Sequence, residues 1–401
     1  MEFPAFTGLF CTFVSMKRRQ PILCIILFCC LQLWGQERKP WVVRTVNKLG
    51  AFIDTLTIKG IDSRYIEVPE KPWQLVLKFN ANDMDLKSKS HMSSEYISRK
   101  GYYGEINMES SFKPTMTASI GAWIGYRGYG WGYSLSLTKN NGRNFSIGAT
   151  GSNYSINLRS RKFSTRELDT SIWGYDEDGY TEIPEGTIET WDDVEVRRTI
   201  IDGFYLLNGK RFSHAAAYDQ SVKQIRSAGS LVIGAMWFQT SLDYAARKNA
   251  LLIQVLGDIG RIKIQEGSIG IGYAYNWVPM KNLLVNVTAM PMLALLNRTK
   301  IDLYDSNYDI FLEDAEVSPT GKKRVPDDQS WQEDITLEKT GSQVKYGKVS
   351  FNINARASVT YNFDRYFLNV YGQLNNYRNS IDESTLRLTD WYVNASLGMR
   401  F

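Results

Sequence analysis

The chain holds two histidines, His91 and His214, and histidine is the most common general base in enzymes. Ser213 directly precedes His214, which raises the possibility of a nucleophile beside its base. In an extended segment, neighbouring side chains point to opposite faces, so the pair cannot act together if it lies in a strand. We expect ordinary turn residues at both histidines and no catalytic site.

A second cluster, Asp176-Glu177-Asp178-Gly179, resembles the beginning of a calcium-binding loop. It lacks the later ligands and the closing glutamate of an EF-hand. The alternatives are low-affinity binding of a divalent cation at the cell surface and a solvated acidic loop, and the sequence favours the loop. We therefore expect no metal site and no cofactor.

Arginines form a third group. Arg159, Arg356 and Arg400 alternate with apolar residues, and Asn354 and Asn394 occupy equivalent positions in their segments. A polar face with arginines can line a mildly basic path for small polar or anionic solutes. The same side chains can instead fill an enclosed space with hydrogen bonds, since polar groups must be paired there. The sequence leaves both interpretations open.

The elements that carry these residues are predicted strands, and the last strand is the most regular. Residues 391–401 place apolar side chains at every odd position and mostly small or polar ones at the even positions. Such alternation indicates a strand between two different environments. A terminal phenylalanine after this pattern resembles the final strand of a bacterial outer-membrane β-barrel, where it is read by the barrel-assembly machinery. The residues that would carry this signal are Trp391, Val393, Leu397, Met399 and Phe401.

The segment Phe351–Phe363 indicates which face would meet lipid. Its odd positions are apolar, and its even positions are asparagine, arginine, serine and threonine. Placing the even face outward would put Arg356 near the middle of a bilayer, at a cost of about 2–4 kcal/mol. We therefore expect the arginines and asparagines named above to face the lumen. A β-sandwich or a lipocalin-like barrel would show the same alternation, so the membrane interpretation rests on the two ends of the chain.

Alternating segments recur from Trp73 to the end of the chain, and they predict about twelve strands, with a range of ten to fourteen. Their length suits the roughly 9–11 residues of a tilted membrane-crossing strand. Short turns alternate with two long polar segments, Ser164–Val194 and Lys300–Lys345, which are predicted to be loops. The predicted fold is all-β, an antiparallel up-and-down transmembrane β-barrel.

The amino terminus has the pattern of a secretory signal peptide. Lys17, Arg18 and Arg19 precede an apolar run from Ile22 to Leu33, and Gly35 is a small residue at a plausible cleavage site. A signal-anchor helix is the alternative, but the run is shorter than the roughly 20 residues of a spanning helix. All four cysteines lie in the part that would be removed, so the mature chain is predicted to have no disulfide and no thiol nucleophile.

Three regions follow from these patterns. Residues 1–35 are the upstream residues and the cleaved signal peptide, and residues 71–401 are the barrel. Residues 36–70 are a short periplasmic segment, in which apolar residues at steps of three and four predict a helix ending near Gly60. This segment could be an extension or plug, or it could pack on the barrel rim, and the sequence favours the rim.

Composition limits the partners. The net charge of +5 is too small to favour nucleic acid, and an aromatic content of 13% suits membrane interfaces. No segment of the mature chain reaches the ~18 consecutive apolar residues that predict a spanning helix. The expected location is the bacterial outer membrane. The expected partners are its lipid and lipopolysaccharide, with the barrel-assembly machinery during biogenesis.

Several motifs point to a family. They are Phe112-Lys113-Pro114, the hairpin Gly121–Leu137, Tyr205–Ser213, Ala216–Ser221 and Lys223–Ser230. Together they resemble an uncharacterised family of outer-membrane barrels from Bacteroidota, known as domain of unknown function 4421. The resemblance extends over most of the mature chain and implies the barrel fold, but it carries no activity.

Two functions remain in view, and neither is an enzyme. The first is a narrow channel or transporter for small polar or anionic solutes, which the arginines of the polar face suggest. The second is a non-conducting structural or surface-interaction barrel that displays the two long loops. The sequence identifies no substrate for either.

Overall fold

The computed structural model describes residues 52–92, 105–112, 117–138, 142–176, 179–248, 253, 258–306, 336–381 and 384–401. The predicted signal peptide, the cysteines and the beginning of the predicted helix lie outside these residues, as do Glu177 and Asp178 of the acidic cluster. No helix among the described residues is long and apolar enough to cross a membrane. The chain divides into two compact units, Met1–Asp54 and Thr55–Phe401, and the second holds the barrel.

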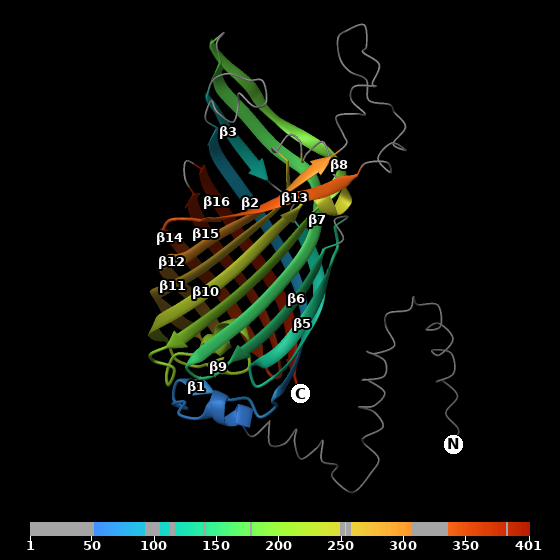
Figure 1. The fold of residues 1–401 in the computed structure, drawn as a ribbon. Helices are drawn as coiled ribbons and strands as arrows, with labels where there is room; N and C mark the ends of the chain where they lie inside the picture. The colour runs from blue at the N-terminus through green and yellow to red at the C-terminus, as the bar shows by residue number, and fades with distance from the viewer. Residues whose placement is uncertain are drawn as a thin grey trace, which may run out of the picture. The chain divides into compact units, whose positions relative to one another are not determined.

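Twelve strands of one 14-stranded antiparallel sheet follow each other around a closed barrel, because β11 pairs with both β10 and β12 (Figure 1). This confirms the predicted fold class and strand number. The barrel strands are β2 (Trp73–Met92), β4 (Thr117–Tyr126), β5 (Tyr129–Ser136), β6 (Arg143–Thr150), β7 (Tyr154–Asp176), β8 (Gly179–Leu206), β10 (Ala228–Asp243), β11 (Ile259–Met280), β12 (Leu283–Ser306), β14 (Ser350–Phe363), β15 (Tyr366–Ile381) and β16 (Ser384–Arg400).

Short connections gather at one end of the barrel, called here the short-turn end, and long hairpins extend from the other, the long-hairpin end (Figure 1). At the short-turn end Arg127 and Gly128 have positive φ angles of 51° and 90°, which close the tight β4–β5 turn. Trp73 and Phe401 exchange two backbone hydrogen bonds of 2.9 and 3.1 Å at this end. The last residue of the chain thus closes the seam between β16 and β2.

The prediction of a loop at Ser164–Val194 was wrong, because nearly all of these residues lie in strands β7 and β8. Of the second predicted loop, Lys300–Lys345, both ends are strand and residues 307–335 lie outside the described residues. The first segment continues β7 and β8 as a hairpin in which Asp176 pairs with Gly179. Register shifts between Thr165 and Glu167 and between Thr170 and Ile172 accommodate extra residues, and the pairing continues beyond them. In the second segment β12 runs on to Ser306 and pairs with β13 (Leu337–Tyr346). Apolar and polar residues do not alternate regularly in the first segment, so the sequence pattern does not reveal its strands.

The hairpin of β5 and β6 is short, with eight residues in each strand. Beyond its tip the wall continues with β3 (Glu105–Phe112), which pairs with β2 on one side and with β7 on the other. Figure 1 shows β3 beside the extended β7 and β8. Two strands of the barrel therefore end before the extension begins.

Alternation along the strands separates two surfaces. The outward positions form an apolar belt of exposed side chains, including Leu77 on β2, Ile233 on β10, Ile271 on β11 and Val370 on β15. Charged and amide side chains such as Arg356 and Asn394 are buried in the interior. A soluble barrel would instead present mostly polar side chains on its outer surface.

The interior has two different halves. Apolar side chains of β8, β10, β11 and β12 fill one half, including Phe204, Met236, Phe238 and Met292. Tyr377 of β15 reaches this cluster, and its ring lies 4.1 Å from that of Phe238. Polar residues of β2, β7 and β14–β16 line the other half. The candidate site lies in the polar half.

Candidate functional site

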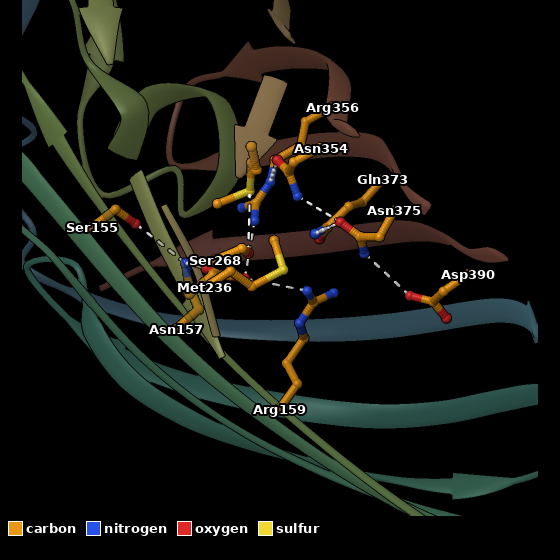
Figure 2. Close-up of polar contacts among 12 residues, drawn as sticks. Ser155, Asn157, Arg159, Met236, Ser268, Asn354, Arg356, Gln373, Asn375 and Asp390 are labelled. Carbon is orange, nitrogen blue, oxygen red and sulfur yellow. Dashed lines mark hydrogen bonds and ion pairs between the residues drawn. The ribbon is translucent and has the colours of Figure 1, made fainter. Parts of the chain in front are cut away.

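Asp202 of β8 is the centre of the polar network inside the barrel. Its carboxylate accepts hydrogen bonds from Arg356 at 2.9 Å, Asn157 at 2.9 Å and Arg159 at 3.3 Å. Arg159 lies on neighbouring β7, whereas Arg356 reaches from β14, which is separated from β8 by three strands of the barrel order. Figure 2 shows the two arginines approaching from different walls. The interaction between Asp202 and Arg356 therefore crosses the lumen.

A second cross-lumen link runs from Arg198 of β8 to Asp390 of β16, which are directly hydrogen-bonded. Asn375 donates to Asp390 at 3.2 Å and accepts from Asn354 at 2.6 Å (Figure 2). Asn354 in turn accepts from Arg356 at 3.1 Å. The two buried ion pairs belong to one connected network, and buried charges require such pairing.

Arg161 of β7 lies beside this network without a carboxylate in ion-pair contact among the described residues. It pairs directly with Arg198 in the β7–β8 ladder, so two cations face each other on the lumen side. Three guanidinium nitrogens have no hydrogen-bond partner within the described part of the chain: Nε of Arg161, and Nε and Nη2 of Arg198. Like charges directly opposite on a sheet are destabilising, and unpaired buried donors add to the cost. This pair is the least balanced concentration of positive charge in the described network.

An aromatic surface forms another part of the site. The indole of Trp123 lies against the inner wall at glycines of β5 and β6, where an added Cβ would lie 2.9 Å from it at Gly132 and 3.0 Å at Gly148. The ammonium group of Lys78 lies 4.1 Å from the ring centroid. Lys78 has no carboxylate in ion-pair contact among the described residues. Its positive charge is stabilised by this cation–π contact with the Trp123 ring.

These groups surround a cavity of about 140 Å³. Five cationic and three carboxylate side chains line it: Lys78, Arg159, Arg161, Arg198 and Arg356, with Asp202, Asp219 and Asp390. The cavity therefore has an excess of positive charge.

The connection between β8 and β10 folds into the barrel and forms a plug at the short-turn end, defined here as residues 213–222. Its helix α4 (His214–Tyr218) is capped by the Ser213 hydroxyl, which accepts from the Ala216 amide. Gln220 has a positive φ of 61°, and its carbonyl accepts two hydrogen bonds from Arg400 at 3.0 and 2.8 Å.

Strands around the barrel hold this plug in place. Its backbone carbonyls accept from Gln74 of β2 at 3.2 Å, Asn276 of β11 at 2.9 Å and Asn369 of β15 at 3.1 Å. Its Tyr218 hydroxyl donates to Asn286 of β12 at 2.6 Å. Tyr218, Asp219 and Gln220 also line the cavity, so the plug forms one of its walls.

Residues before the barrel pack under the plug. β1 (Ile66–Glu67) pairs with β9 (Lys223–Gln224), and Ile66 joins a buried cluster with Ala215, Ala217 and Val222. Of the predicted amino-terminal helix, residues 52–58 are described and helical. The sequence left open whether this segment forms a plug or packs on the barrel rim. Residues 61–68 pack against the plug, and the plug itself comes from the connection between β8 and β10.

The predicted site residues occupy different parts of the lumen. Asn354 and Arg356 belong to the Asp202 network, and Arg159 joins it from β7. Asn394 donates to Asn80 at 2.7 Å on the β2 side. Arg400 contacts the plug and Asn362 and does not join the Asp202 network. The outward positions hold the proposed assembly residues Trp391, Val393, Leu397, Met399 and Phe401.

The sequence interpretation did not single out Asp202, Arg198, Arg161 or Asp390. A usable signal exists in β8, where Arg198 and Asp202 are four residues apart and therefore share a strand face. Their neighbours on this face are apolar, so the face does not look polar from the sequence. Their cross-lumen partners, Asp390 and Arg356, lie more than 150 positions away, which alternation cannot reveal.

The prediction for Ser213 and His214 assumed an extended segment, and this condition is not met, because Ser213 caps α4. The hydroxyl accepts from a backbone amide, and His214 packs between Phe204 and Tyr218. Burial lowers the pKa of His214 to about 3, and nearby Arg356 contributes to the shift. Within the described ranges, no three histidine, cysteine or acidic side chains are placed to hold a metal ion.

Solved structures with similar folds are outer-membrane barrels. The outer membrane protease OmpT from Escherichia coli is 9% identical, with a TM-score of 0.39 and coverage of 85% of this chain and 100% of that chain. The β domain of the Bordetella autotransporter BrkA is 11% identical, with a TM-score of 0.27 and coverage of 82% and 99%. The P. putida toluene transporter TodX is 9% identical, with a TM-score of 0.26 and coverage of 83% and 91%. Such distant similarity transfers no function.

A search of curated proteins gave no significant match. A family model, described as "Domain of unknown function (DUF4421)", matches residues 61–401, from the segment under the plug to the last strand. The chain therefore belongs to the DUF4421 family.

Proposed function

We propose that this protein is an integral barrel of the bacterial outer membrane that binds a small anionic solute in its lumen and transports it when the plug moves. The exposed apolar belt supports the location, because a soluble protein rarely exposes so much contiguous apolar surface. In outer-membrane barrels short turns face the periplasm and long loops face outward. The short-turn end is accordingly assigned to the periplasm.

The observation that carries the anion is the arginine pair of β7 and β8. Arg161 and Arg198 face each other, and three of their guanidinium nitrogens have no partner among the described residues. The cavity beside them is lined by two more cations than carboxylates. A carboxylate, sulfate or phosphate group between them would supply the missing charge and accept the unpaired N–H groups. A neutral or cationic solute would not remove both the repulsion between the two arginines and the cost of their unpaired N–H groups.

The plug supports a gated transporter over an open channel. It is hydrogen-bonded to β2, β11, β12, β15 and β16, and it separates the cavity from the short-turn end. A solute in the cavity can therefore leave toward the periplasm only after these contacts break. The resting protein is expected to conduct little or no current.

Planar-bilayer recording tests this proposal. Ser213 lies within hydrogen-bonding distance of Gln224, so a short Gly-Ser linker can replace residues 213–222. The unplugged barrel should conduct, and its reversal potential in a salt gradient should show a preference for anions that Arg161→Gln reduces. Cation selectivity of the unplugged barrel, or no conductance, would contradict the proposal.

One observation favours a second function, a surface-interaction barrel. The β7–β8 hairpin extends well beyond the wall, and its two strands comprise 23 and 28 residues. A hairpin of this length offers a large surface to a partner outside the cell. Replacing residues 168–187 with a short turn should then abolish partner capture and leave barrel assembly intact. Unchanged capture would exclude this hairpin as the binding surface.

A further inference from the structure

The outer surface carries an ordered row of cations near the long-hairpin end. On β7 and β8, Leu158 and Ile201 are outward apolar residues that pair directly in the ladder. Four residues further toward the long-hairpin end, Lys162 and Arg197 pair directly on the same face, with 49% and 66% of their side chains exposed. On these two strands the cations therefore lie four residues beyond an outward apolar pair.

The ladders extend this row across six neighbouring strands. Arg143 of β6 pairs with Lys162, and Lys263 of β11 pairs with Lys300 of β12. Ser241 of β10 occupies the position between Arg197 and Lys263. Five of the six outward positions along this ladder row are thus cationic.

The opposite side of the barrel repeats the arrangement. Arg378 of β15 pairs with Arg387 of β16, which pairs with Lys87 of β2. Arg378 and Arg387 also lie four residues beyond an outward apolar pair, Leu374 and Trp391. The eight cations of the two rows are called here the cationic collar: Lys87, Arg143, Lys162, Arg197, Lys263, Lys300, Arg378 and Arg387.

Few carboxylates balance the collar. Glu195 pairs with Lys162 and Arg197, and Asp302 pairs with Lys300 at 3.4 Å. Lys87 lies 3.8 Å from Asp85. The other four members, Arg143, Lys263, Arg378 and Arg387, have no ion pair within the described part of the chain. Cations that directly face one another on a sheet repel, so the collar favours bound anions.

We propose that the cationic collar binds the phosphate groups of an acylated glycolipid in the outer leaflet. This inference rests on the membrane location proposed above but not on anion binding in the lumen. Four residues of strand span roughly 13 Å, and strand tilt reduces the height above the apolar belt to about 10 Å. A lipid whose acyl chains contact the belt carries its headgroup at this height. A soluble anion would gain nothing from the adjacent apolar belt.

Arginine and lysine suit this ligand. The guanidinium group binds phosphate through paired hydrogen bonds, and the ammonium group binds it as a point charge. Neighbouring strands are about 4.8 Å apart, so the six-strand row spans roughly 24 Å. One phosphate group would contact only part of a row of this width. The row therefore favours a headgroup with two phosphates or several lipids side by side.

Native mass spectrometry of the full barrel in neutral detergent tests the proposal. The probes are a diglucosamine lipid with two phosphates and the same lipid after removal of the phosphates. Replacing the four unpaired collar cations (Arg143→Gln, Lys263→Gln, Arg378→Gln, Arg387→Gln) should weaken binding of the phosphorylated probe about fivefold for each charge removed. Binding of the dephosphorylated probe should not change.

The matched control removes four exposed cations at the short-turn end: Lys71→Gln, Lys210→Gln, Lys281→Gln and Arg365→Gln. It should bind both probes as the wild type does. Heat-modifiable migration in gels verifies that each variant is folded. If the quadruple variant is not folded, two double variants replace it, one with the substitutions on β6 and β11 and one with those on β15 and β16. Equal affinity of the collar variant and the wild type would overturn the proposal. So would an equal loss in the control, or a wild type that does not distinguish the two probes.

Discussion

Arg161 of β7 and Arg198 of β8 face each other directly across their ladder on the lumen side. Arg198 forms an ion pair with Asp390, and Arg161 has none among the described residues. The buried Arg198 and the half-buried Arg161 have three guanidinium nitrogens without a partner in the described part of the chain, which is an unfavourable arrangement. The arrangement becomes favourable when an anion occupies the cavity beside them. The predictions below concern the network around this pair, the plug below it and the seam that closes the barrel.

Asp202→Asn should strongly destabilise the barrel. The substitution removes the charge that faces both Arg356 and Arg159 inside the lumen, and breaking a buried ion pair costs about 3–5 kcal/mol. Unfolding in urea, followed by tryptophan fluorescence in detergent micelles, measures the free energy of unfolding. Asp364→Asn in the exposed β14–β15 turn is the control and should stay within about 0.5 kcal/mol of the wild type. An equally stable Asp202→Asn protein would show that the network contributes little.

Arg400→Gln should loosen the plug without opening the wall. Buried Arg400 donates two hydrogen bonds to the Gln220 carbonyl and one to Asn362. Hydrogen bonds from a charged group contribute about 1.5–3 kcal/mol, so amide exchange in residues 213–222 should accelerate at least about tenfold. Hydrogen–deuterium exchange measures this, with Arg365→Gln as the exposed neighbour control. Unchanged exchange in the plug would mean that other contacts hold it.

His214 should make the stability of the protein fall in acid. Its pKa in the folded state is about 3, while the unfolded chain has the ordinary value near 6.5. Above pH 6.5 both states are neutral and the residue has no pH-dependent effect. As the pH falls from 6.5 toward 3, only the unfolded state takes up the proton, so stability decreases by up to about 1.4 kcal/mol per pH unit.

His214→Phe fills the same position between Phe204 and Tyr218 with a ring that cannot be protonated. The variant should lose this part of the pH dependence between pH 6.5 and 3. Unfolding free energies of both proteins across this range provide the comparison. Parallel curves for the wild type and the variant would exclude His214 as the source.

Deleting Phe401 should impair assembly. The residue exchanges two backbone hydrogen bonds with Trp73, and its side chain is exposed at the short-turn end of the seam. Heat-modifiable migration of protein from outer-membrane fractions measures insertion, and the deletion should reduce the folded form. Phe363→Asp, which changes an exposed aromatic residue near the same end but leaves the seam intact, is the control. Normal insertion of the shortened chain would show that closure does not depend on its last residue.

Alternation in the sequence predicts the barrel well, because each strand separates two environments over many residues. The pattern of Phe351–Phe363 determines a strand face that contains both Asn354 and Arg356. The pattern fails where a strand lies beyond the belt, as in the β7–β8 hairpin. There apolar and polar residues do not alternate regularly, so no strand period in the sequence marks the ladder.

The site was harder to predict than the wall. The link between Asp202 and Arg356 spans 154 positions of sequence, and no local pattern encodes a contact across the lumen. The plug has three consecutive alanines, Ala215–Ala217, which show neither strand alternation nor a helix of recognisable length. The apolar half of the lumen also escaped prediction, because inward and outward faces of β8 both contain apolar residues.

The central claim is that the lumen binds an anion at the arginine pair, and isothermal titration calorimetry of the purified barrel with inorganic phosphate and sulfate tests it most directly. Arg161→Gln removes the arginine without a carboxylate partner and leaves the Arg198–Asp390 pair intact. Arg365→Gln, an exposed cation outside the lumen, is the matched control. The account predicts saturable binding to the wild type and the control, and at least about tenfold weaker binding to Arg161→Gln, as expected when a charge-assisted hydrogen bond is lost. Equal binding by all three proteins, or no binding of either anion to the wild type, would contradict it.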